Sequence, residues 1–443
     1  MTLLDLLPSI GQAAPRRFDP AIWPATTSSD RDGRLCIGDV PLTDIADEFG
    51  TPVYVIDEAD FRRRARRYRT TLREVEIVYA GTSLLTTSIA RWVREEGLGV
   101  DVCSSGLLAV ALAGGVDPAR IVMHGNAKSP DELRDAVTVG VGRIVLDSSL
   151  EIAYLAGLAR RRQRVLIRVT PDVDIHGHRA LRTGISDQKF GFTVTGDHAA
   201  EAVNSVLAHP ILDLIGLHCH IGSQVTDPGF YGEAIRRLIA AMADIRARHG
   251  VILTELNIGG GHAVPYVHGD AELDLDTLAR VIEDSLDEAC AAEHFPRPAV
   301  VVEPGRGVSA RAGVTLYRVC SLNTRPSGRT FVAVDGGMGD NPRVGLFGAE
   351  ATVALANRHG SGVKRPVTVS GRHGGEIAHD VQLPSDVHAG DLLSVACTGS
   401  YHHSMASNYN MVGRPPLVAV NGGRARELVR RETIADLLSR DRG

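Results

Sequence analysis

The chain has 443 residues, of which 44% are hydrophobic and 23% are charged, and its formal net charge is -5 at pH 7. This composition is typical of a globular protein with room for two domains. It gives no basic footprint for nucleic acid and contains no apolar run long enough to cross a bilayer, so we expect neither kind of partner.

The predicted elements begin with an irregular arm over residues 1–30, which is rich in Pro, Ala and Ser. Residues 31–58 follow as short strands and a short helix, and they end in a strand over 52–57. A helix dense in arginine is expected over 60–72, and its run of charge is read as a solvated face. The first residues lack a basic segment and do not predict a signal peptide.

Short apolar runs alternate with amphipathic segments between residues 59 and 310. The candidate strands are 76–80, 99–102, 121–123, 143–146, 165–169, 215–218, 255–258 and 299–302, and helical patterns such as 87–96 and 130–140 lie between them. Periodicity alone also allows an open doubly wound sheet. The eight β–α steps favour a (β/α)₈ barrel.

Strand-like runs dominate residues 311–443, at 314–319, 330–335, 365–370, 391–396 and 417–421, with a closing helix over 432–438. This pattern predicts a C-terminal β-domain, which the strands of residues 31–58 are able to join. The six cysteines form no CxxC pair and so suggest neither zinc nor a redox motif. We therefore expect a reduced, cytoplasmic protein.

Three glycine-containing motifs carry candidate site residues. Gly259-Gly260-Gly261 follows a predicted strand, where consecutive glycines let backbone amides approach a phosphate closely, although a plain strand-to-helix turn also explains them. Glu303-Pro304-Gly305-Arg306 follows another strand. Its carboxylate could pair with a protonated ring nitrogen and its arginine with an anion, or the two could form a structural ion pair. Gly399-Ser400-Tyr401 lies in the predicted β-domain.

The segment His218-Cys219-His220-Ile221-Gly222-Ser223-Gln224 also ends a predicted strand. Two histidines two residues apart on a strand face the same side, so a metal pair is conceivable. No third ligand stands at an informative spacing, and we predict no metal site. A His220 ring stacked on a pyridine, with Ser223 near a phosphate, explains the segment better.

Together these motifs resemble the pyridoxal-phosphate (PLP) decarboxylases of the alanine-racemase-like fold (fold type III), most closely the diaminopimelate decarboxylases. The resemblance also includes Asp101-Val102-Cys103, His124-Gly125-Asn126, Gln188-Lys189-Phe190-Gly191 and Val334-Asp335-Gly336-Gly337-Met338. It implies a barrel with a C-terminal β-domain, PLP as cofactor, a small amino acid as substrate, carboxy-lyase chemistry and a homodimer with shared active sites. By the same resemblance the cofactor-binding residues are His220, Ser223, Gly259, Gly260, Gly261, Glu303, Gly305, Arg306 and Tyr401, and the substrate-binding positions are Arg306, Arg343 and Phe347.

The sequence departs from the family pattern at positions that carry catalytic or substrate-binding groups in the family. In the family a lysine two residues after Tyr-Ala holds PLP as a Schiff base, and here that position is Thr82, which has no amine. Leu107 stands where the family has an acid. Gly374 stands where the family has a catalytic cysteine. Glu376, two residues later, is the carboxylate that remains as a candidate catalytic group. Phe347 replaces a tyrosine.

The sequence contains only three lysines that could replace the anchor, Lys128, Lys189 and Lys364. The first two stand in stretches that match the family, and Lys364 is expected in an exposed polar loop, so none is a convincing replacement. Three readings stay open: a diverged enzyme that holds PLP non-covalently and acts on a modified amino acid, a non-catalytic relative that pairs with an active paralogue as a heterodimer, and a protein that binds another phosphorylated ligand. Whether the chain is an enzyme is left open.

Overall fold

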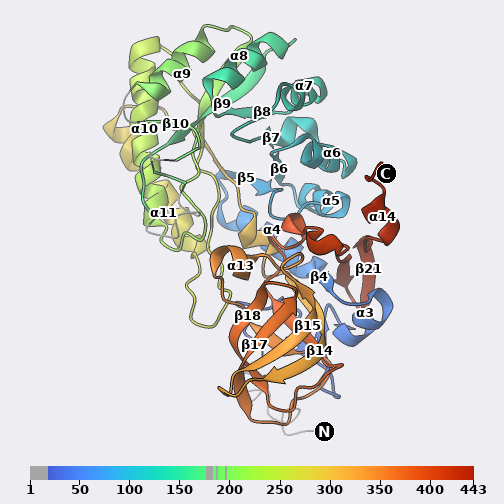
Figure 1. The fold of residues 1–443 in the computed structure, drawn as a ribbon. Helices are drawn as coiled ribbons and strands as arrows, with labels where there is room; N and C mark the ends of the chain where they lie inside the picture. Colours follow the sequence, from blue (N-terminus) through green and yellow to red (C-terminus); the bar gives the residue numbers. More distant parts are fainter. Residues whose placement is uncertain (1–17, 176–182, 186–187, 195–196) are drawn as a thin grey trace.

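The computed structural model describes residues 18–175, 183–185, 188–194 and 197–443. Residues 1–17 of the predicted N-terminal arm lie outside the described residues. Two parts are visible in Figure 1: helices α5 to α11 surround a set of parallel strands in one part, and the long strands β14, β15, β17 and β18 form the other. Within the described residues no helix is long and apolar enough to cross a membrane.

Eight parallel strands form the closed barrel. They are β5 (Val75–Ala80), β6 (Gly99–Val102), β7 (Ile121–Met123), β8 (Arg143–Leu146), β9 (Gln163–Thr170), β11 (Leu212–His218), β12 (Glu255–Asn257) and β13 (Ala299–Val302). Pairing of β13 with β5 and of β8 with β9 completes the ring, and β10 (Phe192–Thr193) adds to β9 outside it. The (β/α)₈ barrel predicted from the count of β–α steps is therefore confirmed.

Helices follow the barrel strands in turn. They are α5 (Thr87–Glu95), α6 (Ser105–Ala113), α7 (Pro130–Val139), α8 (Ser149–Leu158), α9 (His198–Leu207), α10 (Gly229–His249), α11 (Leu275–Ala292) and the short α12 (Arg306–Ser309). Aliphatic side chains fill the barrel interior, namely Val78, Val122, Val145, Leu166, Ile215 and Val301. Because the strands are buried on both faces, they read in sequence as apolar runs without alternation.

The helix α4 (Glu58–Thr71) precedes the first barrel strand and carries the run of arginines. The prediction that its arginines form a solvated face is only partly correct. Arg64 is 6% exposed and binds Asp60, which is fully buried, whereas Arg66 is 54% exposed. The arginines of this helix are therefore divided between a buried side and an exposed one.

The strand-rich part is one mixed sheet in the order β18-β17-β15-β14-β4-β20-β21. Its strands are β4 (Val53–Asp57), β14 (Gly313–Thr324), β15 (Thr330–Gly337), β17 (Lys364–Arg372), β18 (Glu376–Pro384), β20 (Leu417–Asn421) and β21 (Arg424–Val429), with β19 (Leu392–Ala396) joining β14 to β16 (Val353–Leu355). The N-terminal strand β4 lies between β14 and β20. Segments from both ends of the chain therefore build this sheet.

Short elements complete the fold. The strands β1 (Ser28–Ser29), β2 (Leu35–Ile37) and β3 (Val40–Pro41) form a separate three-stranded sheet rather than extending the large one. Three short helices are α3 (Leu42–Phe49), α13 (Arg343–Phe347) and α14 (Ile434–Leu438). Of these, α13 carries two predicted substrate positions from the strand-rich part toward the barrel.

Candidate active site

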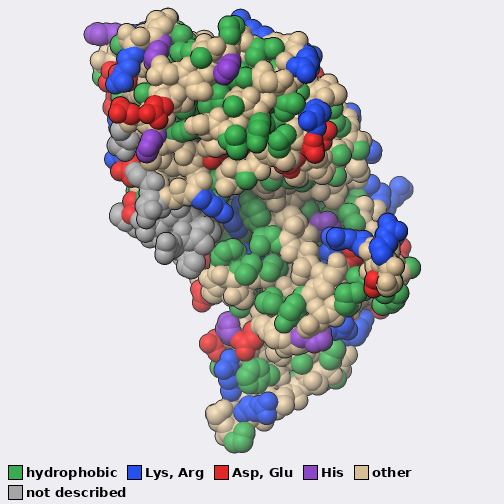
Figure 2. All heavy atoms as spheres, turned by 45° about the horizontal axis from the view of Figure 1, so that its top comes forward, with side chains coloured by type: hydrophobic (Ala, Val, Ile, Leu, Met, Phe, Trp, Pro, Cys, Tyr) green, Lys and Arg blue, Asp and Glu red, His purple; other side chains and the backbone are tan. Residues whose placement is uncertain are grey.

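A cavity of about 690 Å³ lies at the carboxyl ends of the barrel strands, where the strand-rich part meets the barrel. The predicted site residues that line it are Thr82, His220, Ser223, Gly260, Gly261, Glu303, Gly305, Arg306, Arg343, Phe347 and Tyr401. Arg343, Phe347 and Tyr401 come from the strand-rich part, and the others follow barrel strands. Figure 2 shows a hollow between the two parts with apolar side chains beside it.

Glu303 directly follows β13, and its carboxylate accepts hydrogen bonds from three side chains. Its Oε1 accepts hydrogen bonds from His124 Nε2 at 2.8 Å and Asn257 Nδ2 at 2.7 Å, and its Oε2 from His218 Nε2 at 3.2 Å. Burial alone would raise the pKa of this carboxyl, but the two histidines lower it well below its usual value. Glu303 is therefore a fixed negative charge at the cavity floor.

The pKa values of the histidines near Glu303 are shifted in different directions. Burial opposes the charge of His124, yet Glu303 raises the pKa of His124 above its usual value. Burial lowers the pKa of His218 to about 4 and that of His220 to about 3, so both are neutral at pH 7. His220 Nδ1 accepts a hydrogen bond from the Gly260 amide at 3.3 Å, which places its proton on Nε2.

The glycine segment after β12 is held in a conformation that other residues resist. Gly261 has φ of +97°, and a Cβ there would lie 1.9 Å from the Gly222 carbonyl oxygen. A Cβ on Gly260 would lie 2.0 Å from the Glu303 carbonyl oxygen. Gly259 lies behind them and donates its amide to Asn257 Oδ1 at 2.9 Å. Packing thus demands glycine here, and the resulting loop brings bare backbone to the cavity wall.

Arg306 supplies positive charge beside this loop. Its Nη2 donates to Ser223 Oγ at 3.1 Å and its Nη1 donates to the hydroxyl of Tyr266, while its buried Nε has no partner among the described residues. The guanidinium carbon lies 4.8 Å from the ring centre of Tyr401. Arg343 also lies over the Tyr266 ring, with its guanidinium carbon 3.6 Å from the ring centre. Two arginines therefore share one tyrosine at this end of the cavity.

These donors fit a phosphate-bearing pyridine. The unpartnered Nε of Arg306, the Ser223 hydroxyl and the glycine backbone suit a phosphate, because each offers a donor to an anion. Glu303 suits a protonated ring nitrogen, and the neutral His220 ring suits stacking on the ring face. The chemistry of the donor set therefore agrees with the cofactor that the sequence implies.

The predicted anchor position carries no amine. Thr82 follows β5 and lines the cavity together with Tyr401, where burial raises the pKa of the Tyr401 hydroxyl above its usual value and the Thr82 side chain lowers it. The Tyr401 backbone amide donates to the Ser83 carbonyl oxygen at 2.9 Å, which fixes the strand-rich part against this loop. A hydroxyl pair thus occupies the place where the family pattern has a lysine.

Two of the three lysines line the cavity, but they differ in their partners. Lys128 Nζ donates to the carbonyl oxygens of Gly125 and Val145, each at 2.6 Å, and pairs with Glu151 at 2.9 Å. All three of its protons are therefore used. Lys189 is exposed and lies 5.0 Å from the ring centre of Phe190. Lys364 begins β17 rather than lying in the loop that the sequence suggested.

Other departures from the family pattern lie away from the floor of the cavity. Glu376 begins β18, pairs with His379 Nδ1 at 2.6 Å, and does not line the cavity of its own chain. Gly374 stands in the turn before that strand, and Leu107 packs on the barrel core from α6. The structure therefore brings every predicted site residue to the cavity except Gly259, which lies behind it, and Glu376.

Sequence reasoning did not assign roles to several residues of the site. Asn257 and His124 hold Glu303, and Tyr266 contacts both arginines. Each of these residues lies at the end of a predicted strand or in the loop that follows it. Position relative to a strand was the one indication of a role that the sequence offered. The donor atoms of His124, His218 and Glu303 lie within 4.8 Å of one another, so this trio could also hold a metal ion.

Comparison with known proteins gives a consistent result. The family model for the pyridoxal-dependent decarboxylase, pyridoxal binding domain, matches residues 58–310. A diaminopimelate decarboxylase of Actinosynnema pretiosum subsp. auranticum is 50% identical over 444 residues and is covered fully, as is this chain. The diaminopimelate decarboxylase of Mycobacterium bovis is 41% identical, over 95% of this chain and 97% of that protein.

The solved structures agree with the sequence relatives. A crystal structure of diaminopimelate decarboxylase from M. jannaschii matches with a TM-score of 0.88 and 28% identity, over 94% of this chain and 98% of that chain. A co-complex of that protein with L-lysine gives the same values. The barrel, the strand-rich part and their arrangement are therefore shared with these relatives.

Proposed function

This chain belongs to the family of pyridoxal-dependent decarboxylases as a diaminopimelate decarboxylase-like member, and from that premise we propose that it binds PLP without a covalent link and acts on a modified amino acid. The observation that carries this proposal is the contrast inside one cavity. The residues that we propose to face the cofactor line the cavity, whereas Thr82 stands at the anchor position and Lys128 donates all three of its protons within the chain.

In this proposal Arg306, Ser223 and the Gly260–Gly261 backbone hold the phosphate, and His220 and Glu303 hold the ring. PLP, when bound, supplies an electron-withdrawing ring that stabilises negative charge at the α-carbon of an amino acid. Glu303 keeps the ring nitrogen protonated because its own pKa is held low. Since no amine stands at position 82, the chain lacks the family's usual group for exchanging substrate and for moving a proton at the α-carbon.

The substrate end of the cavity also differs from the family pattern. Arg343 offers a buried guanidinium to a carboxylate, while Phe347 offers an apolar ring in place of a phenol. Loss of that hydroxyl removes a polar partner for a substrate's far end. A substrate with a less polar or modified side chain suits such a cavity, because it leaves no buried polar group unpaired.

A second candidate function is a non-catalytic one, as a regulatory partner of an active paralogue. The full engagement of Lys128 by two carbonyls and Glu151 favours it, because an ammonium group that donates to three acceptors has no lone pair with which to form an imine. Co-purification with an active decarboxylase, together with no turnover of the isolated chain, is its expected signature.

We also propose a cytoplasmic homodimer, with a heterodimer as the variant that the second function requires. The six free cysteines are consistent with a reducing compartment. Large apolar side chains near the cavity mouth are exposed, at 53% for Leu346, 37% for Met405 and 60% for Met411. Apolar surface of this kind suits a second copy of the chain.

The decisive experiment adds PLP to the purified full chain, treats it with borohydride, and maps any adduct by intact and peptide mass. Retained PLP with no adduct supports non-covalent binding, and candidate amino acids are then tested for turnover. An adduct on Lys128, Lys189 or Lys364 would overturn the non-covalent part. No retained PLP would overturn the proposal and leave another phosphorylated ligand as the occupant.

A further inference from the structure

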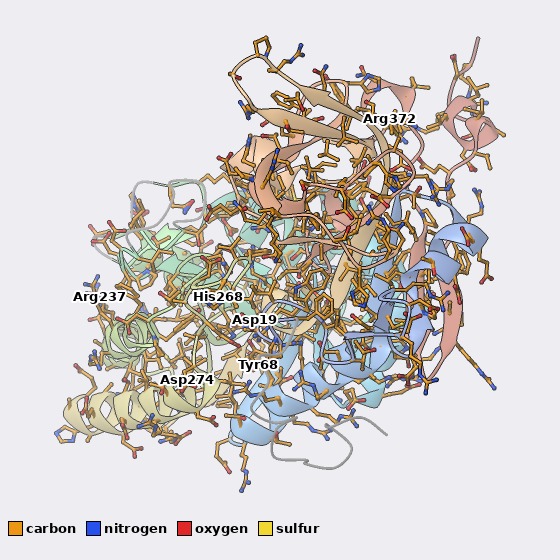
Figure 3. All side chains as sticks on the ribbon, turned by 90° about the horizontal axis from the view of Figure 1, so that it is seen from below. Asp19, Tyr68, Arg237, His268, Asp274 and Arg372 are labelled. Carbon is orange, nitrogen blue, oxygen red and sulfur yellow. The ribbon has the colours of Figure 1, made fainter. Side chains whose placement is uncertain are left out.

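A second cavity of about 270 Å³ lies on the outer side of the barrel, between α4 and the segment that connects β12 to α11. It is distinct from the candidate active site, since the two cavities share no lining residue. Its charged lining residues are Arg63, Arg64, Arg67, Arg311 and Glu272. Figure 3 shows the molecule from below with Tyr68, another lining residue, labelled on α4.

Two of these arginines are buried. The side chains of Arg64 and Arg311 are 6% and 8% exposed. Burial lowers the pKa of Arg64 from its usual value, and the like charge of Arg311 lowers it further. Two guanidinium groups are therefore held close together in a place where water screens them poorly.

The acidic groups in this region do not balance the arginines. Asp60 accepts from both Arg63 and Arg64, at 2.6 and 2.9 Å, so one carboxylate serves two cations. Glu272 is fully engaged by Arg311 through contacts of 2.8 and 2.5 Å. Among the described residues Arg67 forms one ion pair, with Asp276 at 4.0 Å, and that carboxylate is 72% exposed, while Asp274 acts on Arg67 at longer range. The cavity therefore keeps positive charge without a close partner.

Unused donors also remain in the buried guanidinium groups. Arg64 uses only Nε in the hydrogen bonds of the described residues, and its Nη2 is buried without a partner. Arg311 likewise has an Nε without a partner. Buried arginine nitrogens are rarely left unsatisfied, because a missing hydrogen bond to a charged group is costly. These two nitrogens are not exposed to the cavity, so an oxygen-rich anion there would offset the charge of Arg64 and Arg311 rather than accept from those atoms.

We propose that this arginine-lined cavity is a second anion site, which binds a small phosphate or carboxylate independently of the candidate active site. Arg67 and Arg63 close on the anion from the exposed side, and Arg64 and Arg311 provide the charge behind it. This inference does not depend on whether PLP binds in the barrel.

The helix α4 offers a matched control for the test. Arg63 and Arg67 line the cavity and are 52% and 48% exposed, whereas Arg66 is 54% exposed and faces Glu96 on the other side. The double variant Arg63→Gln/Arg67→Gln is therefore compared with Arg66→Gln. The single variant Arg67→Glu serves as a second probe, since it changes one half-exposed side chain.

The experiment titrates inorganic phosphate into the full chain by calorimetry, at constant ionic strength, with and without saturating PLP. Wild type and Arg66→Gln are expected to bind phosphate in the presence of PLP. The double variant and Arg67→Glu are expected to bind it about tenfold more weakly or worse, because each removes a charge-assisted contact. Citrate in place of phosphate distinguishes a carboxylate ligand from a phosphate ligand.

Two results would overturn the inference: equal phosphate affinity in the double variant and Arg66→Gln, or no phosphate binding once PLP is saturating. If PLP does not bind at all, wild type should show two phosphate sites and the double variant one. Failure of the proposed function is in that way separated from failure of the second anion site.

Discussion

At the scale of single residues, position 82 separates this chain from the pattern that it otherwise follows. Thr82 and Tyr401 both line the cavity, and Arg306, Ser223 and Glu303 line it with them. A threonine cannot form an imine, but it leaves the surrounding contacts undisturbed. Placing an amine at position 82 therefore tests directly whether the cavity orients PLP for a covalent link.

The variant Thr82→Lys is expected to gain a covalent link to PLP, because the new side chain extends into the cavity that Glu303 and Arg306 line. Borohydride treatment and peptide mapping should place the adduct on residue 82, with about one cofactor per chain. Thr82→Val is the control, since it removes the hydroxyl and adds no amine. Absence of an adduct in the lysine variant would show that the cavity does not orient PLP as in the family.

Asp101 predicts a pH dependence of stability. Burial raises the pKa of this carboxyl to about 7, and Glu303 adds to the rise against the opposing charge of His124. The folded state therefore holds a proton that the unfolded chain has lost, so stability falls as pH rises from about 4 to about 7.

The variant Asp101→Asn removes this titration while its amide oxygen can still accept from the Gly81 amide, which now lies 3.2 Å from Asp101 Oδ1. Thermal unfolding is measured at pH 5 and pH 8. The melting temperature of the variant, relative to wild type, is expected to be higher at pH 8 than at pH 5. An equal difference at both values would mean that Asp101 is ionised throughout.

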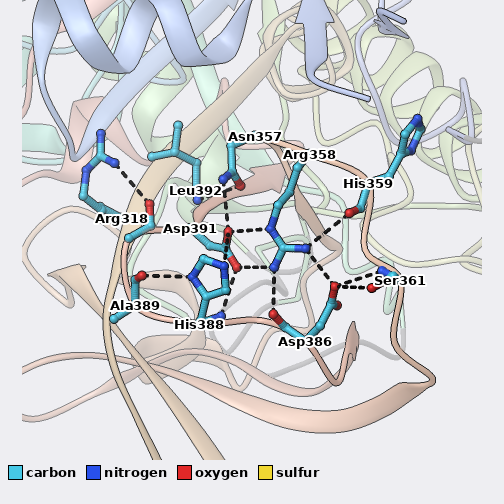
Figure 4. A network of polar contacts seen from close by, with 11 residues as sticks. Arg318, Asn357, Arg358, His359, Ser361, Asp386, His388, Ala389, Asp391 and Leu392 are labelled. Carbon is cyan, nitrogen blue, oxygen red and sulfur yellow. Dashed lines mark hydrogen bonds and ion pairs between the residues drawn. The ribbon is translucent and has the colours of Figure 1, made fainter. Parts of the chain in front are cut away.

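At the scale of elements, a polar network holds the connection between β16 and β17 against the start of β19 (Figure 4). Arg358 Nη2 lies 2.7 Å from Asp391 Oδ2, and its Nη1 lies 2.8 Å from Asp386 Oδ2. The side chain of Asp391 is fully buried. Asn357 adds a further hydrogen bond to Asp391 at 3.0 Å, so this loop is fixed by charge rather than by apolar packing.

The variant Arg358→Gln is expected to lower the free energy of unfolding by about 3–5 kcal/mol, because it leaves the Asp391 carboxylate buried without its cation. Burial alone would raise the pKa of Asp391, but Arg358 and its other donors lower it. The stabilisation is therefore present above the unfolded pKa of Asp and is lost as pH falls through the folded pKa. Urea unfolding at pH 7 and pH 3 measures both effects, and Arg365→Gln on exposed β17 is the control.

At the scale of the whole molecule, the cavity lies between the barrel and the strand-rich part. Segments from both ends of the chain are needed to build the strand-rich part. β4 from the N-terminal region lies between β14 and β20, and this sheet carries Tyr401 and α13 to the barrel mouth. Exposed apolar side chains stand at the same mouth. The molecule thus presents its site at a surface suited to a second chain.

The variant Leu346→Glu/Met411→Glu is expected to shift the proposed dimer to monomer, because it places charges on two side chains that are 53% and 60% exposed now. Sedimentation velocity measures the change over a range of concentrations. Ile252→Glu is the matched control, since Ile252 is 51% exposed and precedes β12 at the far end of the barrel strands. A monomeric wild-type chain, or equal dissociation in the control, would contradict the assignment of this face.

The sequence by itself determined the barrel strands, the strand-rich C-terminal part and the loss of the anchoring lysine. Alternation of apolar and amphipathic runs reports local periodicity, and a missing amine is visible at one position. It did not determine what surrounds Glu303, because His124, Asn257 and His218 come from separate strands that meet only when the barrel closes. Tertiary structure alone also showed that Lys128 is fully engaged and that three arginines of α4 meet Arg311 at a second cavity, because both facts depend on contacts between segments far apart in the chain.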